Sequence, residues 1–314
     1  MTETRSQVQL LKDNVGKYIL GKSETIELAV VTLLAGGHLL IEDVPGIGKT
    51  TLAYALARSI NCSFSRIQFT SDLLPSDILG VSIFDAKKQE FVFRHGPIFT
   101  NVVLADEINR TTPKTQSCLL EAMNERQVSV DSATYRLPRP FMVVATQNPI
   151  EYHGTHPLPE SELDRFLMRI RIGYPDETAE KQIVRQQLLT LPKNKIEPVL
   201  SSEDVTRMQD AISNVQVEDG VLDYVMTLVE ATRRHPALIL GASPRGALYL
   251  YRSAQALAFV QDRDYVIPDD VKRLAVPVLA HRLVGESAVR AAPGELDQYD
   301  SIVQEIIDST SVPL

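Results

Sequence analysis

The chain has 314 residues and a formal net charge of −8 at pH 7, so it is long enough for one large core or two smaller ones. The negative charge argues against a protein whose main role is binding nucleic acid, because such binding needs clustered Lys and Arg. The longest apolar stretch, residues 28–41, contains two adjacent glycines and is too short to cross a bilayer.

The N-terminal segment MTETRSQVQ lacks the basic and then apolar pattern of a secretory signal. The two cysteines, Cys62 and Cys118, are far apart and form no C-x-x-C motif. We therefore expect a cytoplasmic protein in a reducing compartment, with no direct membrane insertion.

Up to about residue 173, short β-branched runs alternate with helical patterns, which is typical of βαβ units on a parallel sheet. The sequence therefore predicts an α/β fold. The expected strands are residues 38–42, 64–69, 101–106, 141–147 and 166–172.

After residue 173 the strand signal fades and helical periodicity dominates. Gly173, Tyr174 and Pro175 mark the junction, so we expect an α/β domain over residues 1–173 and an all-helical domain over residues 174–314. The expected helices of the second domain are residues 176–190, 202–213, 218–234, 244–260, 269–282 and 298–308.

The segment EDVPGIGKTT, residues 42–51, nearly matches the phosphate-binding pattern G-x-x-x-x-G-K-[ST] and precedes a helical pattern. Gly46 and Gly48 allow successive backbone N–H groups to turn inward around a phosphate, and the helix N-terminus adds its positive dipole end. We expect Lys49 to bind the β- and γ-phosphates and the Thr50 hydroxyl to ligate Mg²⁺. The expected cofactor-binding residues of this loop are Pro45, Gly46, Ile47, Gly48, Lys49, Thr50 and Thr51.

Asp43 stands where this pattern has its first glycine. Asp tolerates a positive φ better than most residues, so the turn can survive if the carboxylate points away from the phosphates. The alternative interpretation is an ordinary Gly-Pro turn between a strand and a helix.

The segment NVVLADEINR places two acids directly after an apolar run, as at the carboxyl end of a buried central strand. Asp106 is placed to hold the Mg²⁺ shell, and Glu107 to orient and deprotonate an attacking water. Asn148, just past the strand at residues 141–147, can position water beside the γ-phosphate without adding charge. Taken alone, such acids are commonly solvated surface and Asn-Pro is commonly a turn.

Together these motifs resemble the AAA+ ATPases, and the text between them is similar to the MoxR family. The resemblance extends over residues 15–250. The segments that carry it are GPIFTNVVLADEINRTTPKTQSCLLEAMNERQVSV, LPRPFMVVATQNPIEYHGTHPLPESELDRF and GASPRG. It implies a P-loop AAA+ core with a helical lid, which binds ATP and Mg²⁺.

The resemblance also implies roles for individual residues. Lys49 and Thr50 belong to Walker A, Asp106 and Glu107 to Walker B, Asn148 to sensor 1 and Arg245 to sensor 2, and Arg165 in LDRF is the arginine finger. By the same resemblance, Ile19, Leu20 and Gly21 form the segment on the adenine side of the nucleotide. The alternative is that they are ordinary core residues. A salt bridge to Glu162 or Asp164 is the alternative for Arg165, with Arg169 and Arg171 as competing fingers. Whether Arg245 acts in its own or a neighbouring subunit stays open.

Residues 80–97 and 126–141 alternate apolar and polar side chains about a turn, so each predicts a hairpin. They are similar to the helix-2 insert and the pre-sensor-1 hairpin of the AAA+ branch that contains MoxR, and such hairpins commonly face the pore of a ring. A solvated hairpin without a partner is the alternative.

The resemblance implies a chaperone-like ATP hydrolase that forms a homo-oligomeric, hexameric ring and remodels protein clients, among them proteins with von Willebrand factor A domains. Two other classes remain. A nucleic-acid motor is disfavoured by the acidic charge and the absence of a basic stripe. A P-loop kinase would need an acceptor pocket but no arginine from a neighbour.

Overall fold

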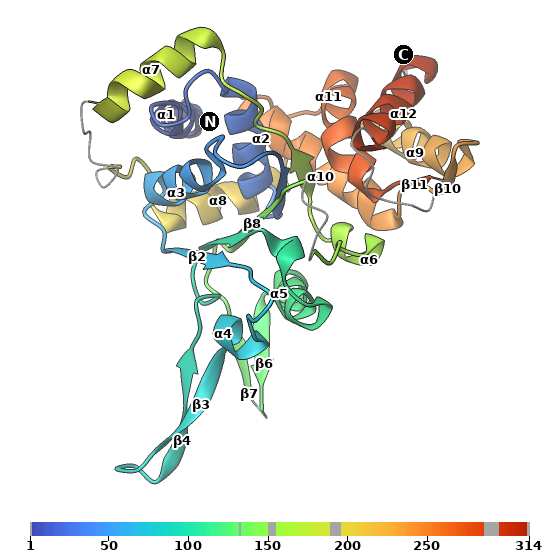
Figure 1. Cartoon of the computed structure of the whole chain (residues 1–314). Coiled ribbons are helices and arrows are strands. Elements are labelled where there is room, and N and C mark those ends of the chain that lie inside the picture. The colour runs from blue at the N-terminus through green and yellow to red at the C-terminus, as the bar shows by residue number, and fades with distance from the viewer. Residues whose placement is uncertain (1, 132, 150–154, 189–195, 286–294, 313–314) are drawn as a thin grey trace.

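The structure, a computed structural model, describes residues 2–131, 133–149, 155–188, 196–285 and 295–312 (Figure 1). Its centre is a five-stranded parallel sheet in the order β2-β5-β8-β1-β9. The strands are β1 (Leu39–Glu42), β2 (Phe64–Gln68), β5 (Val102–Asp106), β8 (Met142–Gln147) and β9 (Met168–Ile170). All five predicted strands are confirmed, although β9 is shorter than the apolar run that predicted it.

Alternate residues of the strands pack into two different cores, as the period of two in a strand requires. Leu39 and Ile41 of β1 face the core that contains α1 (Thr2–Gly16), α2 (Ser23–Leu34) and α3 (Lys49–Ser59). Leu40, between them, faces the core on the other side, with α5 (Pro113–Glu125). The central strands β1, β5 and β8 are therefore buried on both faces, which explains why they are mostly apolar. The edge strand β2 is only partly buried and also carries polar side chains.

Two antiparallel hairpins project from the α5 side of the sheet (Figure 1). The first, β3 (Gly80–Asp85) with β4 (Glu90–His95), follows the short α4 (Pro75–Leu79). The second is β6 (Gln127–Val130) with β7 (Ala133–Arg136). Both hairpin predictions are confirmed. The hairpins touch through Phe93 and Tyr135, whose rings stack at 4.4 Å, and through the Ser82 hydroxyl, which donates to Asp131 at 2.7 Å.

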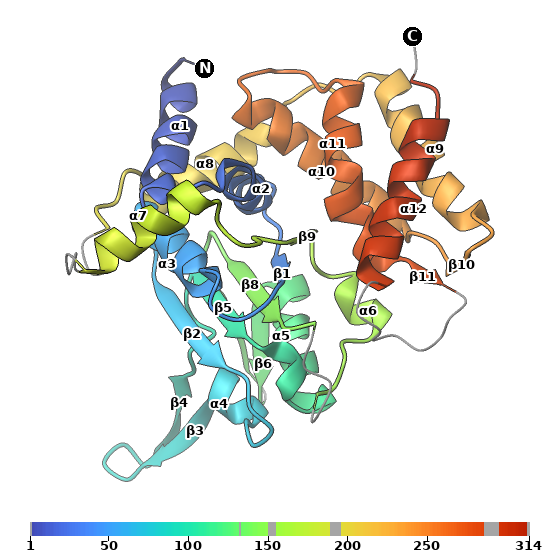
Figure 2. The same ribbon diagram turned by 45° about the horizontal axis from the view of Figure 1, so that its top comes forward.

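The C-terminal part is helical, as predicted (Figures 1 and 2). One group, α9 to α12, packs together beside the sheet. The other two helices, α7 and α8, lie over the side of α1, α2 and α3. The bounds are α6 (Glu160–Leu163), α7 (Glu177–Leu188), α8 (Ser202–Ile212), α9 (Asp219–Arg234), α10 (Pro244–Val260), α11 (Pro268–Leu279) and α12 (Glu295–Ser309), with 3₁₀ turns at Ile108–Arg110 and Ala280–Arg282.

The helical part also contains a small antiparallel pair that the sequence did not indicate, β10 (Leu238–Leu240) with β11 (Val284–Gly285). These strands are too short to produce a periodic pattern. Helix α8 contacts both α2 of the sheet layer and α10 of the helical group. The domain boundary at residue 173 stays a prediction.

Candidate nucleotide site

The strand order brings the predicted site residues to one edge of the sheet. Strand β8 lies between β1 and β5, with Glu42 in register with Gln147 and Ala105 with Ala145. Because all three strands are parallel, their carboxyl ends meet at that edge. The loop after β1, the acids that end β5 and Asn148 after β8 are therefore neighbours, although they lie far apart in the chain. Asn148 is buried there, with 6% of its surface exposed.

The loop between β1 and α3 is an open backbone cradle. Gly46 and Gly48 have φ values of +86° and +100°, which few side chains tolerate. Gly46 is exposed, and a Cβ placed on it would meet nothing within 4 Å. Gly48 precedes α3 without a side-chain cap, so the first amides of α3 are left for a ligand. Thr50 and Thr51 stand half-buried in the first turn. This arrangement fits a phosphate chain.

Asp43 is held away from the cradle. Its Oδ2 accepts hydrogen bonds from the backbone N of Ile172 at 2.8 Å and of Gly173 at 2.7 Å, and its Oδ1 accepts from the backbone N of Val44 at 2.9 Å. Its φ is not positive, so the turn never requires glycine at this position. The backbone oxygen of Asp43 accepts from Lys49 Nζ at 2.6 Å. The departure from the P-loop pattern is thus an anchor that ties the loop to the segment after β9.

Thr146 connects the two acids at the end of β5. Its hydroxyl donates to Asp106 Oδ1 at 2.7 Å and accepts from the backbone N of Glu107 at 2.9 Å. Glu107 has a φ of +57°, an uncommon conformation for a residue other than glycine, and it turns the side chain out of the strand direction. The sequence singled out both acids but gave no sign that Thr146 holds them.

Strand β2 supplies two further partners that sequence reasoning missed. Arg66 binds Asp106 Oδ2 through Nε at 3.0 Å and through NH2 at 2.6 Å. Gln68, two residues on and therefore on the same face, donates to Glu107 Oε2 at 2.8 Å. Glu107 also accepts from Arg110 at 3.0 Å. Both acids are oriented by β2, and a cation at Asp106 would share its carboxylate with a guanidinium.

Ile19, Leu20 and Gly21 lie in the turn after α1. Ile19 is buried, and its Cδ1 would be 3.7 Å from a Cβ on Gly48, so it adjoins the phosphate loop. Gly21 has a φ of +72°, and a Cβ there would lie 3.1 Å from the Cβ of Ala179 in α7. The structure therefore places this segment between the loop and α7.

Arg165 lies at the opposite end of the sheet, where the parallel strands begin. It is two residues before Leu167, whose backbone N donates to the oxygen of His38 at 2.8 Å, at the amino end of β1. Its NH1 donates to the backbone oxygen of Leu120 in α5 at 2.9 Å, on the opposite face of the sheet from α3. No ion pair of Arg165 is found among the described residues.

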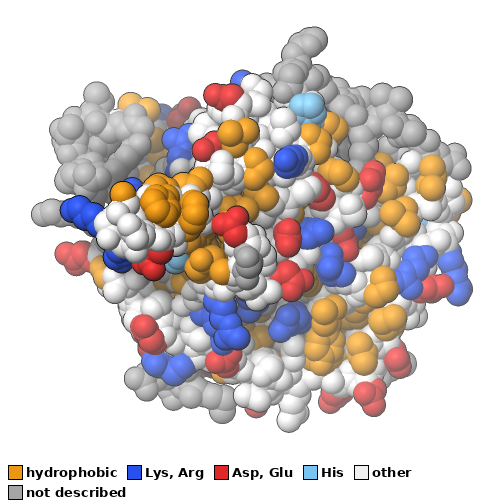
Figure 3. Space-filling view, turned by 90° about the horizontal axis from the view of Figure 1, so that it is seen from below, with side chains coloured by type: hydrophobic (Ala, Val, Ile, Leu, Met, Phe, Trp, Pro, Cys, Tyr) orange, Lys and Arg blue, Asp and Glu red, His pale blue; other side chains and the backbone are white. Residues whose placement is uncertain are grey.

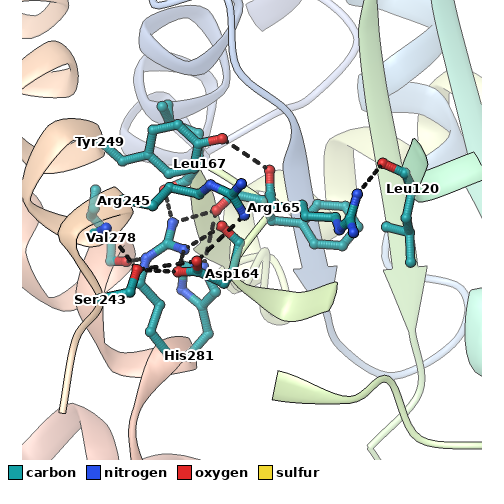
Figure 4. Close-up of polar contacts among 12 residues, drawn as sticks. Leu120, Asp164, Arg165, Leu167, Ser243, Arg245, Tyr249, Val278 and His281 are labelled. Atoms are coloured by element: carbon teal, nitrogen blue, oxygen red, sulfur yellow. Dashed lines mark hydrogen bonds and ion pairs between the residues drawn. The ribbon is translucent and has the colours of Figure 1, made fainter. Parts of the chain in front are cut away.

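The neighbouring Asp164 points away from Arg165 and into the helical part (Figure 4). It accepts from the Ser243 hydroxyl at 3.0 Å and from Arg245 NH1 at 3.4 Å, both at the start of α10. It also accepts from Arg282 NH1 at 2.7 Å. Arg245 is therefore held at Asp164, the residue before Arg165 in the chain, and away from the phosphate loop of the same chain, while the Arg165 guanidinium points the other way. Arg282, which follows α11, was not singled out by the sequence.

The two competitors of Arg165 have structural partners. Arg169 is buried and binds Glu42 at 3.3 Å and also Asp300 of α12. Arg171 approaches Asp300 at 3.9 Å. Burial raises the pKa of Glu42, against the lowering effect of Arg169 and Arg171. These contacts tie β1 and β9 to the C-terminal helix.

Over the described ranges, no group of three or more His, Cys, Asp or Glu side chains is arranged to hold a metal ion. A magnesium site at Asp106 and Thr50 would be of the kind that depends on phosphate oxygens for its other ligands. The helices of the described part also include none with the length and apolarity needed to span a bilayer.

Comparison with known proteins agrees with this geometry. Residues 38–168 match the family described as "ATPase family associated with various cellular activities (AAA)", and residues 230–306 match the AAA lid domain. A crystal structure of a protein described as a putative ATPase, from Cytophaga hutchinsonii, superimposes with a TM-score of 0.90 at 37% identity, covering 100% of this chain and 97% of that one.

Three curated relatives are similar over most of their length. The uncharacterized protein YeaC of Bacillus subtilis is 49% identical over 302 residues, covering 96% of this chain and 93% of its own. Chaperone MoxR1 of Mycobacterium tuberculosis is 44% identical, covering 86% and 74%. Protein MoxR of Methylorubrum extorquens is 31% identical, covering 100% and 97%. The predicted fold and family are confirmed, and the chain belongs to the MoxR family of AAA+ ATPases.

Proposed function

We propose that this protein hydrolyses ATP at the interfaces of a ring of identical subunits and uses the cycle to remodel or mature protein clients. Membership of the AAA family implies nucleotide binding.

The cradle would receive the phosphates of ATP. Backbone amides from Gly46 to Thr51 would donate to the β- and γ-phosphates, and Lys49, which donates to the Asp43 oxygen, would pair with them instead. Thr50 and Asp106 would hold a Mg²⁺ ion, which would supply positive charge to neutralise the phosphates. Ile19, Leu20 and Gly21 would contact the adenine.

Hydrolysis needs an oriented water. Glu107, held by Gln68 and Arg110, is the proposed base, and its φ keeps the carboxylate at the edge where the phosphates would lie. Asn148 is neutral and buried at the end of the strand between β1 and β5, so it is the proposed sensor of the γ-phosphate.

The observation that carries the proposal is the separation of the arginines from the phosphate loop. At about 3.3 Å per residue, the four residues of β1 alone span roughly 13 Å between its amino end, near Arg165, and the start of the loop. Arg165 also turns toward α5, on the face opposite α3. Within one subunit, Arg165 would therefore not reach the ATP bound by the same chain. Arg245 is held at Asp164, so it would not reach that ATP either.

The two arginines could instead reach the ATP of a neighbouring subunit. If the Arg165 face of one copy docks on the phosphate loop of the next, two guanidinium groups reach the transferred phosphoryl group. Such a contact joins two different faces of the same chain and closes into a ring when the rotation permits. We propose a hexamer, as the family resemblance implies. The arrangement disfavours a monomeric P-loop kinase.

The client would meet the hairpins. Phe84 and Phe91 are paired across β3 and β4 and are 53% and 73% exposed. Seen from below, this side of the molecule shows exposed hydrophobic groups with positive and negative side chains interspersed (Figure 3). That mixture suits a polypeptide better than a phosphate backbone. Clients with von Willebrand factor A domains and a cytoplasmic location are part of the proposal.

The test uses subunits with complementary defects. Arg165→Ala and Glu107→Gln should each bind ATP and assemble but turn over at least about 100-fold more slowly. Mixed together, they should regain part of the activity, because an intact site of one variant meets the intact arginines of the other. Arg234→Ala, at an exposed surface ion pair of α9, is the matched control and should retain activity. Absence of recovery with intact assembly would remove Arg165 from the site.

A further inference from the structure

Asp164 and Arg282 form a buried connection between the strand layer and the helical lid. Arg282 has 1% of its side chain exposed, and Asp164 has 18%. The guanidinium NH1 donates to both the carboxylate and the backbone oxygen of Asp164, each at 2.7 Å. A pair with this little access to water is weakly screened by salt and has one well-defined geometry.

Arg282 holds the chain on both sides of Arg165. Besides Asp164, its NH2 donates to the backbone oxygens of Phe166 and Leu167, the latter at 3.3 Å. Its Nε donates to Val278 of α11 at 2.7 Å, so the guanidinium is fixed to the lid. The backbone that carries Arg165 is thus bound to α11 through one side chain.

The same carboxylate fixes the start of α10. Ser243 is the N-cap of α10, accepting from Gly246 N at 3.3 Å while donating to Asp164. Gly246 permits the close approach, because a Cβ there would lie 3.2 Å from Arg282 Cδ. Arg245 follows two residues after the cap and pairs with Asp164 as well.

Arg165 itself points the opposite way and is only partly satisfied. NH1 binds Leu120, while Nε is buried without a hydrogen-bond partner among the described residues. A buried donor without a partner is costly, which suits a side chain that acquires another partner in a larger assembly.

We infer that Asp164, with Arg282, is a positioning residue that aligns Arg165 of the core with Arg245 of the lid, so that both are presented together to the ATP of the neighbouring subunit. This inference rests on the proposed function and deepens it. Asp164 does not touch the nucleotide. Because Asp164 joins the core to the lid, the position of the lid would determine whether Arg165 and Arg245 reach the neighbouring ATP together.

The test is Asp164→Asn, which preserves the shape but removes the charge that holds Arg245 and Arg282. The variant should bind ATP with a Kd within about threefold of wild type and assemble, while its kcat falls at least tenfold. Mixed with Glu107→Gln subunits it should regain activity, because its own Walker residues are intact and only its arginine face is defective. A merely structural role would leave no intact site to be rescued.

Glu230→Gln is the matched control, since Glu230 also binds two arginines, Arg233 and Arg234, but on the lid surface. It should keep wild-type turnover. If Asp164→Asn does not fold, Arg282→Lys decides, because lysine retains one donor to Asp164 and loses the others. Its kcat should fall and should recover with Glu107→Gln.

The two hypotheses fail differently. Recovery for Arg165→Ala with Glu107→Gln, but none for folded Asp164→Asn or Arg282→Lys, would overturn the positioning role and leave the shared site intact. Wild-type kcat in folded Asp164→Asn would overturn it as well. No recovery for Arg165→Ala, with intact assembly, would remove Arg165 from the shared site and would leave Asp164 with no finger to position.

Discussion

Asp43 Oδ2 accepts a 2.7 Å hydrogen bond from the backbone N of Gly173, 130 positions further along the chain. The same oxygen binds Ile172 N at 2.8 Å. The residue that departs from the P-loop pattern therefore fastens the phosphate loop to the segment that leads to α7. The carboxylate is turned away from the cradle, so the departure is compatible with binding an anion.

Replacing Asp43 with the glycine of the P-loop pattern should lower the stability of the fold. Asp43→Gly removes two long-range bonds to a charged acceptor and adds backbone freedom, so we expect the free energy of unfolding in urea to fall by about 2–4 kcal/mol. ATP affinity should change less than threefold. Asp85→Gly is the control, because Asp85 also accepts from two backbone amides, Lys87 and Lys88, but within an exposed turn. An equal loss in both variants would contradict the anchor.

Thr146→Val should remove the hydrogen bonds that hold Asp106 and Glu107 in place. The substitution keeps the shape but removes the hydroxyl bonded to Asp106 and Glu107, so kcat should fall about tenfold and stability by about 1–2 kcal/mol. Turnover and urea unfolding measure these effects. Thr32→Val removes a buried hydroxyl bonded to Leu28 in α2 and should not change kcat. Unchanged turnover in Thr146→Val would count against this support.

Arg66→Gln should make the protein need less Mg²⁺. The guanidinium competes with a cation for Asp106, and relieving about 1 kcal/mol of repulsion lowers the half-saturating Mg²⁺ concentration roughly threefold to tenfold. A Mg²⁺ titration of ATP turnover measures the change. Arg58→Gln, at an exposed position of α3, is the control. A higher Mg²⁺ requirement would mean that Arg66 instead orients Asp106 for the metal.

Acid should destabilise the fold below about pH 6.5. His38 Nδ1 accepts from Val143 N at 3.0 Å and its Nε2 faces the Met123 oxygen at 3.1 Å, which suits the neutral ring. Burial lowers the pKa of His38 from 6.5 to about 4. Between these values the unfolded chain binds a proton that the folded chain does not, so stability falls as the pH falls, by up to about 3 kcal/mol.

Urea unfolding at pH 7.5, 6.0 and 5.0 checks this prediction. His281 adds to the slope, because burial also lowers the pKa of its ring. His38→Gln can accept and donate at the same places without titrating, so its stability should depend less on pH. His95→Gln, an exposed change, is the control. The same pH dependence in His38→Gln and wild type would exclude His38 as the cause.

The sequence by itself determined the features that depend on neighbouring residues. Short β-branched runs predicted the five strands, and the glycine loop before α3 predicted the cradle, because backbone conformation and burial pattern are local properties. The acids at the end of β5 and Asn148 after β8 were found for the same reason, since each follows an apolar run.

Only the tertiary structure decided which side chains meet. Asp43 with Gly173, Arg66 with Asp106, and Arg282 with Asp164 are separated by 130, 40 and 118 positions, and no local pattern links them. The helical periodicity of residues 269–282 predicted a helix but could not show that the arginine at its end is buried against the backbone around Arg165. Strand order and the packing of the lid on the sheet fix these contacts, because they determine which segments, far apart in the chain, are buried against each other.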